Sequence, residues 1–157
     1  MNDINFILPE IFISISILFL LMLGVYKNNS SKLVFTLSIF SLIITLGLTI
    51  NLPLHQDIFL FNRTYKIDQF SKFMKSITIL AGIFVLLSSY KYVKITKILK
   101  IEYPILILSS MLGMLVMISS YDLIVFYVGL ELQSLALYVL AAFNREQINS
   151  SEAGLKY

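Results

Sequence analysis

Five long apolar runs, separated by short polar segments, dominate this chain of 157 residues. An α-helix needs a run of about 20 apolar residues to cross the hydrocarbon core of a bilayer. In lipid, a helix also satisfies the hydrogen bonds of its own backbone. The runs therefore predict an all-α, polytopic membrane helix bundle with five transmembrane helices and the start of a sixth. The five helices are expected at residues 5–26, 33–54, 72–92, 103–120 and 123–143.

Composition supports this class and excludes several others. The chain is 58% hydrophobic and 13% charged, whereas soluble domains hold about 25% charged residues. Its net charge of +3 is too small to argue for nucleic acid as a partner. The sequence has no cysteine, and His55 is its single histidine, so no metal site is predicted. His55 itself is expected in a loop, with a solvated side chain.

One carboxylate, Glu131, interrupts the fifth run near its middle. A helical rise of about 1.5 Å per residue places it roughly 13 Å beyond Asp122, close to the bilayer midplane. A charge at that depth costs about 3 kcal/mol or more, and such residues usually mark functional sites. Glu131 is therefore the first candidate for a functional residue. The alternative is a protonated carboxyl group that only holds helices together through hydrogen bonds.

Three polar residues are expected on the same helix face as Glu131. They are Tyr127, Ser134 and Tyr138, at positions i−4, i+3 and i+7. A polar stripe on a spanning helix faces other protein or a hydrated path rather than lipid. We therefore expect these residues to support Glu131. Gln133 lies off the stripe and is expected to reach a different neighbouring helix.

Two segments near the end of the sequence carry a family resemblance. They are GLELQSLALYVLAAF at residues 129–143 and SSEAGLKY at residues 150–157. These segments resemble the antiporter-like subunit N of respiratory complex I, which is called NADH dehydrogenase subunit 2 in mitochondria. The pairing of E-L-Q-S-L in the fifth helix with E-A-x-x-K-Y at the start of the sixth is characteristic of this family. The opening LPEIF, at residues 8–12, also resembles the start of the family's sequences.

The resemblance implies a membrane-arm subunit of NADH:quinone (ubiquinone) oxidoreductase, a proton-translocating translocase of the respiratory chain. It implies that Glu131 and Lys156 take part in proton translocation, with Glu131 pairing with lysines of later helices along a polar axis. No catalytic residue, cofactor site or metal site is expected in this chain. NADH, FMN, the iron–sulfur clusters and quinone would bind to other subunits, where electron transport takes place.

Two other functions stay open. Subunits of a multisubunit sodium/proton antiporter carry a comparable helix, but different residues flank its glutamate. The chain is also consistent with a truncated, non-pumping structural fragment, because a sixth helix has barely begun at Tyr157. We expect the N-terminal portion of a longer protein, a truncated protein or a split gene product. The expected partners are other complex I membrane-arm subunits, the lipid bilayer and, for a split gene, a second chain carrying the missing C-terminal helices.

A single membrane domain is expected over residues 1–157, with accessory N-terminal helices at 1–101 and the start of the proton-translocating helix repeat at 102–157. Basic residues are more frequent in the loops after the first, third and fifth helices than in the opposite loops. The two sets are Lys27, Lys32, Lys91, Lys94, Lys97, Lys100 and Arg145 against Arg63, Lys66, Lys72 and Lys75. This bias predicts an N-terminus on the outer side of an energy-transducing inner membrane, mitochondrial or bacterial.

Several smaller features allow more than one interpretation. Glu10 lies near the start of the first run, where an interfacial charge is expected rather than a proton carrier. Residues 55–71 mix aromatic, β-branched and charged side chains, a pattern that predicts a short surface hairpin. The lysines between residues 91 and 100 are spaced to bind anionic lipid head groups or to act as a topology signal. Ser151 is expected to cap the sixth helix, with Glu152 in its first turn.

Overall fold

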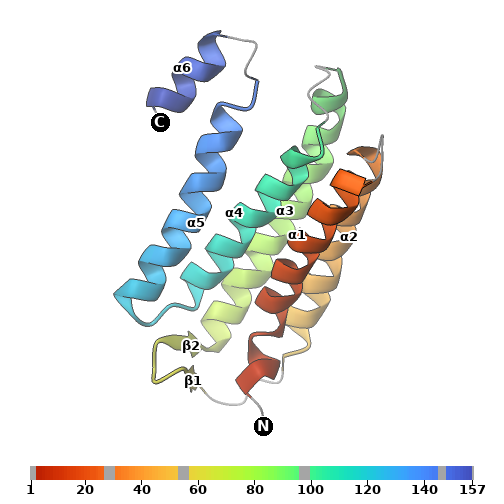
Figure 1. Ribbon diagram of the computed structural model, residues 1–157. Coiled ribbons are helices and arrows are strands. Elements are labelled where there is room, and N and C mark those ends of the chain that lie inside the picture. The colour runs from red at the N-terminus through yellow and green to blue at the C-terminus, as the bar shows by residue number, and fades with distance from the viewer. Residues whose placement is uncertain (1–2, 27–30, 53–56, 96–99, 145–147, 157) are drawn as a thin grey trace.

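The computed structural model describes residues 3–26, 31–52, 57–95, 100–144 and 148–156, and five long helices dominate this part of the chain (Figure 1). The long helices are α1 (Leu8–Tyr26), α2 (Ser31–Ile50), α3 (Gln69–Ile95), α4 (Glu102–Ile118) and α5 (Leu123–Ala141). The shorter elements are the 3-10 helix η1 (Asp3–Phe6), the strands β1 (Ile58–Leu60) and β2 (Tyr65–Ile67), and the helix α6 (Ile148–Lys156). The predicted all-α, polytopic membrane helix bundle is confirmed.

Four of the described helices, α1, α2, α3 and α5, are long and apolar enough to cross a membrane. The remaining long helix, α4, is apolar but has 17 residues. At about 1.5 Å per residue it is about 26 Å long, slightly less than a hydrocarbon core of about 30 Å. Because α1, α3 and α5 all pack against it, α4 is covered mainly by protein.

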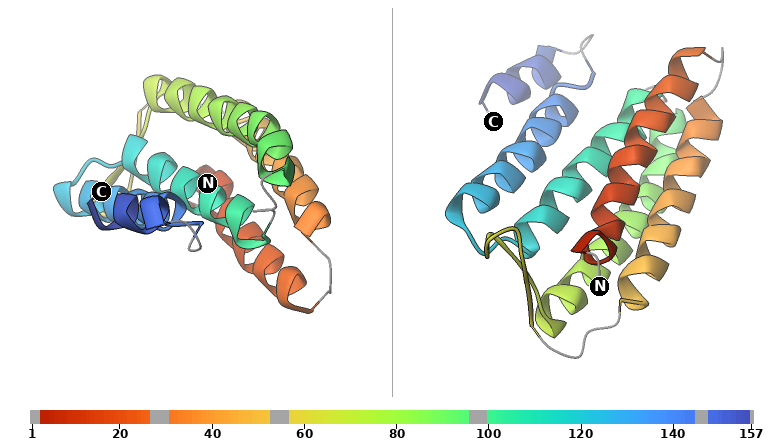
Figure 2. Two further views of the ribbon diagram at one scale, coloured as in Figure 1. Left: turned by 90° about the horizontal axis from the view of Figure 1, so that it is seen from above. Right: turned by 60° about the horizontal axis from the view of Figure 1, so that its bottom comes forward.

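The first four helices form a closed bundle, in which α1 and α3 each pack against both α2 and α4. Seen from above, α1 and α3 lie on opposite sides of α4 (Figure 2). Each helix turns residues seven positions apart into the shared core, a spacing that keeps them on one helix face. These buried residues are Ile13 and Leu20, Phe35 and Leu42, Ile79 and Leu86, and Leu108 and Leu115.

Helix α5 lies outside this bundle and packs against α4 (Figures 1 and 2). The turn between the two helices is short, because α4 ends at Ile118 and α5 begins at Leu123. Asp122 caps α5, since its side chain accepts a hydrogen bond from the Ile124 backbone N–H at 3.3 Å. The predicted antiparallel pair of fourth and fifth helices is therefore present.

The predicted hairpin is present as β1 and β2, which pair in an antiparallel register with Leu60 opposite Tyr65. Phe61, Asn62 and Arg63 turn the chain with φ values of 49°, 53° and 67°. The hairpin closes one end of the bundle through a small cluster of buried side chains. That cluster comprises Phe6, Leu52, Leu60, Tyr65 and Ile67.

Two smaller expectations need correction. α6 begins at Ile148 rather than after Ser151, so Ser151 does not cap it and Glu152 lies beyond its first turn. The hydroxyl of Ser150, inside the first turn of α6, instead donates a hydrogen bond to the Ala141 carbonyl at 3.0 Å, which joins α6 to the end of α5. Lys27, His55, Lys97, Arg145 and Tyr157 lie outside the described residues.

Candidate functional site

Glu131 lies near the middle of α5, and its side chain is half-buried. Two glycines hold α5 close to α4 beside it. A Cβ atom on Gly129 would lie 2.9 Å from the Gly113 carbonyl oxygen, and one on Gly113 would lie 2.7 Å from the backbone N of Gln133. These distances are too short for any side chain, so the two backbones touch. The contact orients the turn of α5 that carries Glu131. It also places the backbone of Gln133 against α4.

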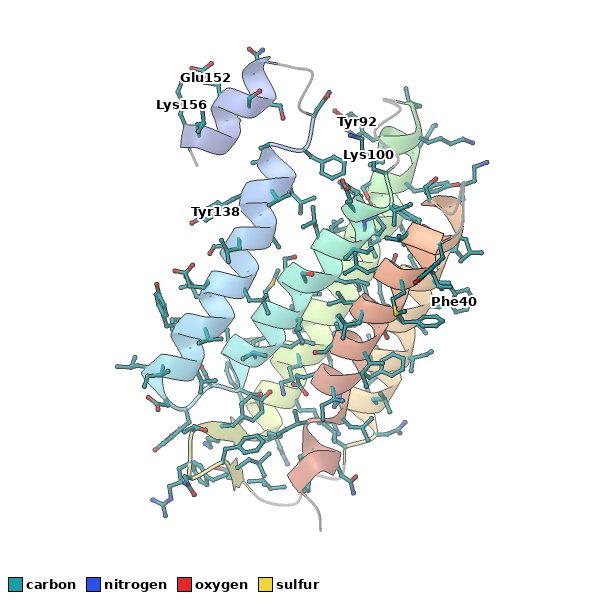
Figure 3. All side chains as sticks on the ribbon, in the orientation of Figure 1. Phe40, Tyr92, Lys100, Tyr138, Glu152 and Lys156 are labelled. Carbon is teal, nitrogen blue, oxygen red and sulfur yellow. The ribbon has the colours of Figure 1, made fainter. Side chains whose placement is uncertain are left out.

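The predicted polar stripe is only partly assembled around the Glu131 carboxylate. Tyr127 is close enough for its hydroxyl to interact with that carboxylate. The hydroxyl of Ser134 donates instead to the backbone carbonyl of Glu131 at 3.1 Å. Tyr138 projects outward from α5 (Figure 3). Since Tyr127 is 59% exposed and Tyr138 39% exposed, the stripe faces outward from the described helices.

Lys156 lies on α6, where it forms an ion pair with Glu152 one helical turn earlier. The Lys156 Nζ to Glu152 Oε1 distance is 2.6 Å, and both side chains are more than half exposed (Figure 3). Among the described residues, Glu131 forms no ion pair with Lys156 or any other cation. The two residues expected to translocate protons are thus on adjacent helices but not in contact.

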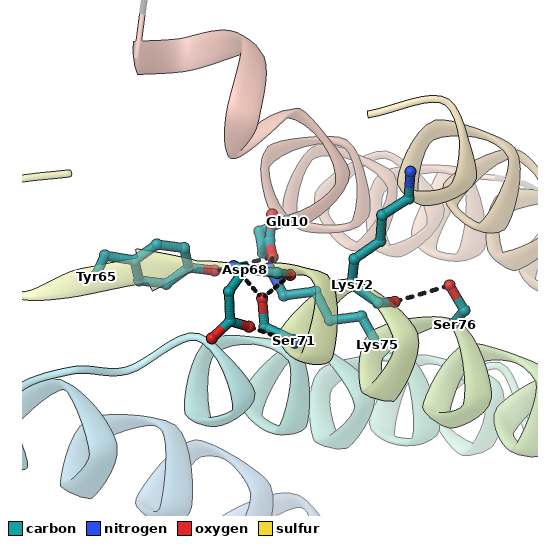
Figure 4. A network of polar contacts seen from close by, with 7 residues as sticks. All are labelled: Glu10, Tyr65, Asp68, Ser71, Lys72, Lys75 and Ser76. Carbon is teal, nitrogen blue, oxygen red and sulfur yellow. Dashed lines mark hydrogen bonds and ion pairs between the residues drawn. The ribbon is translucent and has the colours of Figure 1, made fainter. Parts of the chain in front are cut away.

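A second ionisable site, which sequence reasoning missed, lies inside the four-helix bundle. Lys75 on α3 and Glu10 on α1 form an ion pair with 2.6 Å between Nζ and Oε1, and their side chains are 1% and 5% exposed. The hydroxyl of Tyr65 on β2 donates to the same carboxylate oxygen at 2.9 Å, and Lys75 Nζ lies 3.3 Å from that hydroxyl (Figure 4). We call these three residues the Glu10 cluster.

The Glu10 cluster corrects the expectation that Glu10 is an interfacial charge. Glu10 is 4% exposed, because η1, the hairpin and α3 enclose the start of α1. Burial, followed by the charge of Glu10, raises the pKa of the Tyr65 hydroxyl far above its usual range, so Tyr65 stays a neutral donor. Lys75, counted with the loop lysines from sequence, is instead a buried residue of α3.

Local sequence explains how α3 presents Lys75 to Glu10. Asp68 and Ser71 form a reciprocal cap, in which the Ser71 N–H donates to Asp68 Oδ1 at 2.6 Å and the Asp68 N–H donates to Ser71 Oγ at 2.9 Å. Lys75 follows Ser71 by one turn on the same face. Residues Ser71, Lys75 and Ile79 are all buried at this spacing. In the sequence, the position of Lys75 four residues from each of these two core positions indicated that it is buried.

The whole chain is similar in sequence to known membrane proteins of one name. The sequence is 66% identical over all 157 residues to "NADH-quinone oxidoreductase subunit N" of Pelagibacter ubique (strain HTCC1062). It is 45% identical, over 96% of its length, to the protein of the same name from Bartonella bacilliformis (strain ATCC 35685 / KC583 / Herrer 020/F12,63). The chain is a relative of NADH-quinone oxidoreductase subunit N. The family described as NADH:quinone oxidoreductase/Mrp antiporter, TM, also matches residues 120–157.

The chain spans about a third of the length of these subunit N relatives, 33% of the first and 31% of the second. Its fold is shared with a chain from the structure of respiratory complex I from Thermus thermophilus with bound aureothin. That match has a TM-score of 0.77 at 22% sequence identity, and it covers 95% of this chain and 32% of the other. The sequence similarity to subunit N extends over all 157 residues and so includes the helix that carries Glu131.

Proposed function

We propose that this chain forms the N-terminal part of a membrane-arm subunit of proton-translocating NADH:quinone oxidoreductase, respiratory complex I. The observation that carries the proposal is the 66% identity to a subunit N over the full chain. A carboxylate in the middle of a membrane-spanning helix agrees with that function, because such groups commonly serve ion or proton transfer. The expected location is the inner membrane, with the N-terminus on its outer side.

Glu131 is the residue to which we assign proton binding. A half-buried carboxylate responds strongly to a neighbouring charge, because an approaching cation favours its ionised form and desolvation favours its protonated form. Tyr127 offers a hydroxyl to either form. Movement of a lysine toward or away from Glu131 would therefore release or bind a proton. Lys156 is the cation on the adjacent helix. Its ammonium group would have to leave Glu152 before it could reach Glu131.

The outward face of α5 is where further helices are expected to complete this site. Leu123, Ile124, Val128 and Leu135 are between 56% and 83% exposed, so the described helices leave this face uncovered. We propose that residues 1–101 are accessory helices and that residues 102–157 begin the translocating repeat. The family match beginning at residue 120 supports this division. NADH, FMN, iron–sulfur clusters and quinone are assigned to other subunits of the complex.

A multisubunit sodium/proton antiporter is the second candidate, because the matching family also includes Mrp antiporters. Purification of the full-length subunit through an affinity tag distinguishes the two functions. We expect the tagged subunit to co-purify with NADH-oxidising subunits and with NADH:quinone reductase activity. Recovery of an assembly that exchanges sodium for protons, without any NADH-oxidising subunit, would contradict the proposal. Recovery of the chain without any partner would support a non-pumping structural fragment.

A further inference from the structure

The Glu10 cluster joins the two helices of the bundle that lie on opposite sides of α4. Glu10 belongs to α1 and Lys75 to α3, and each of these helices packs against α2 and α4. The side chains of Glu10 and Lys75 meet between these two helices. A buried ion pair carries a large desolvation penalty, because burial removes the hydration of both charges. The pair is therefore better suited to fixing one geometry than to adding stability.

The charge of Glu10 is compensated through a single oxygen. Both Lys75 and Tyr65 bind Oε1, whereas the buried Oε2 accepts no hydrogen bond from any described residue. The loss of either partner would leave the buried carboxylate poorly compensated. Tyr65 is consequently held to Glu10 by a charge-assisted hydrogen bond, a strong kind of contact.

Tyr65 extends the connection from this ion pair to α5. The strand that carries it is bonded to the turn between α4 and α5, with the Lys66 N–H donating to the Ser119 carbonyl at 2.8 Å. The Tyr121 N–H donates to the Thr64 carbonyl at 2.9 Å. On the other strand, the Phe59 ring meets the Tyr121 ring edge-on, with 5.2 Å between centroids.

The turn that receives these bonds leads directly into the helix of Glu131. Asp122, the cap of α5, follows Tyr121, and its N–H also approaches the Thr64 carbonyl at 3.3 Å. Glu131 lies nine residues beyond Asp122, about 13 Å along a continuous helix. An α-helix is stiff over this distance, so a shift of its first turn moves the whole element.

We propose that Glu10, Lys75 and Tyr65 form a lock that positions α5, and with it Glu131, relative to α1 and α3. The lock acts through the hairpin, which transmits the position of the ion pair to the α4–α5 turn. Its three members are positioning residues, since none of them contacts Glu131 in the described structure. The proposal rests on the proposed role of Glu131 in proton transfer. It adds residues that sequence similarity around Glu131 does not indicate.

The test measures docking of the hairpin separately from proton transfer. Residues 1–157 contain no cysteine, so Phe59→Cys and Tyr121→Cys introduce a unique thiol pair in a full-length subunit from which any cysteine beyond residue 157 has been removed. A short bifunctional thiol reagent applied to membranes then reports how often the two sites meet. We expect Tyr65→Phe to reduce the crosslinking rate about tenfold, the factor that corresponds to one hydrogen bond to a charged group. Glu10→Gln should reduce it similarly.

Controls separate the lock from general loss of structure. Glu102→Gln changes an exposed carboxylate at the start of α4 and should leave crosslinking unchanged. The exchange Glu10→Lys with Lys75→Glu retains opposite charges and should recover part of the crosslinking that Glu10→Gln loses. Crosslinking at the unmodified rate in both Tyr65→Phe and Glu10→Gln would overturn the lock.

Proton pumping supplies the second measurement. Tyr65→Phe should lower pumping per assembled complex, and a preformed crosslink between the two introduced thiols should restore it by holding the hairpin on the turn. Slow crosslinking with undiminished pumping in Tyr65→Phe would overturn the positioning role. Crosslinking does not depend on proton transfer, so a failure of Glu131 as the proton site would leave that result unchanged. The two proposals can therefore fail independently.

Discussion

Gly113 on α4 and Gly129 on α5 bring the backbones of two helices into direct contact, two residues before Glu131. A Cβ on Gly129 would lie 2.9 Å from the Gly113 carbonyl oxygen and 3.0 Å from the Met117 backbone N. In membranes, helices associate largely through such close packing of small residues. The glycine pair therefore determines how near α4 lies to the proposed proton site.

Gly129→Ala is expected to weaken the packing of α4 against α5. The added methyl group meets backbone atoms, which cannot move aside as a flexible side chain can. Overpacking of this kind costs about 1–3 kcal/mol. Gly47→Ala is the matched control, because a Cβ there meets no atom within 4 Å. Thermal unfolding of the purified subunit should show a lower midpoint for Gly129→Ala alone, and equal midpoints would contradict the described contact.

Removal of one member of the buried ion pair should destabilise the bundle more than removal of both. Glu10→Gln leaves Lys75 as an uncompensated buried charge, as Lys75→Met leaves Glu10, and such losses cost about 3–5 kcal/mol. The double variant leaves neither charge. Denaturation of the unmodified subunit and the three variants in detergent gives a double-mutant cycle. Additive losses would show that the two side chains are not coupled.

Asp122→Ala should loosen the first turn of α5. The side chain of Asp122 is the cap of this helix, and loss of a cap costs about 0.5–2 kcal/mol. Asp122→Ser retains a capping oxygen and is expected to keep most of the stability. Hydrogen exchange of the backbone amides of residues 123–126 measures this directly. Equal protection in the alanine and serine variants would exclude capping by Asp122.

Orientation can be read from two exposed basic residues at opposite ends of the bundle. Lys94 lies near the end of α3 and Arg63 lies at the tip of the hairpin. The excess of basic loop residues predicts that Lys94 faces the cytoplasm or matrix and Arg63 the outer side. Cysteines introduced at these positions should react with an impermeant thiol reagent from opposite sides of sealed vesicles. Labelling of Lys94→Cys from the outer side would reverse the topology.

Hydropathy alone predicts the five long helices to within a few residues, because lipid permits little other structure. It also indicates Glu131, since a carboxylate in an apolar run is conspicuous without any knowledge of its neighbours. The hairpin between α2 and α3 is predictable from its aromatic and β-branched residues. These features depend on local sequence, which is why they can be recognised from a single chain.

Contacts between distant residues are the part that sequence does not reveal. Glu10 resembles an interfacial charge because it lies at the start of an apolar run. Its burial results from Tyr65 and Lys75, which are 55 and 65 residues away. By contrast, the Glu152–Lys156 pair follows from i,i+4 spacing and was accessible from sequence. The α6 start at Ile148 depended on a tertiary contact between Ser150 and Ala141.

Proton pumping by the Glu131→Gln variant separates proton transfer by Glu131 from a purely structural role of this carboxylate. Glutamine keeps the size and most hydrogen bonds of glutamate but cannot ionise. Proton uptake and quinone-reductase rate should be measured in membranes containing the full-length subunit, normalised to assembled complex. Glu102→Gln, an exposed carboxylate on α4, is the control. We expect Glu131→Gln to assemble normally and to pump far fewer protons, with Glu131→Asp less affected. Pumping at the unmodified level in Glu131→Gln would contradict proton transfer by Glu131 and leave it as a structural hydrogen-bonding residue.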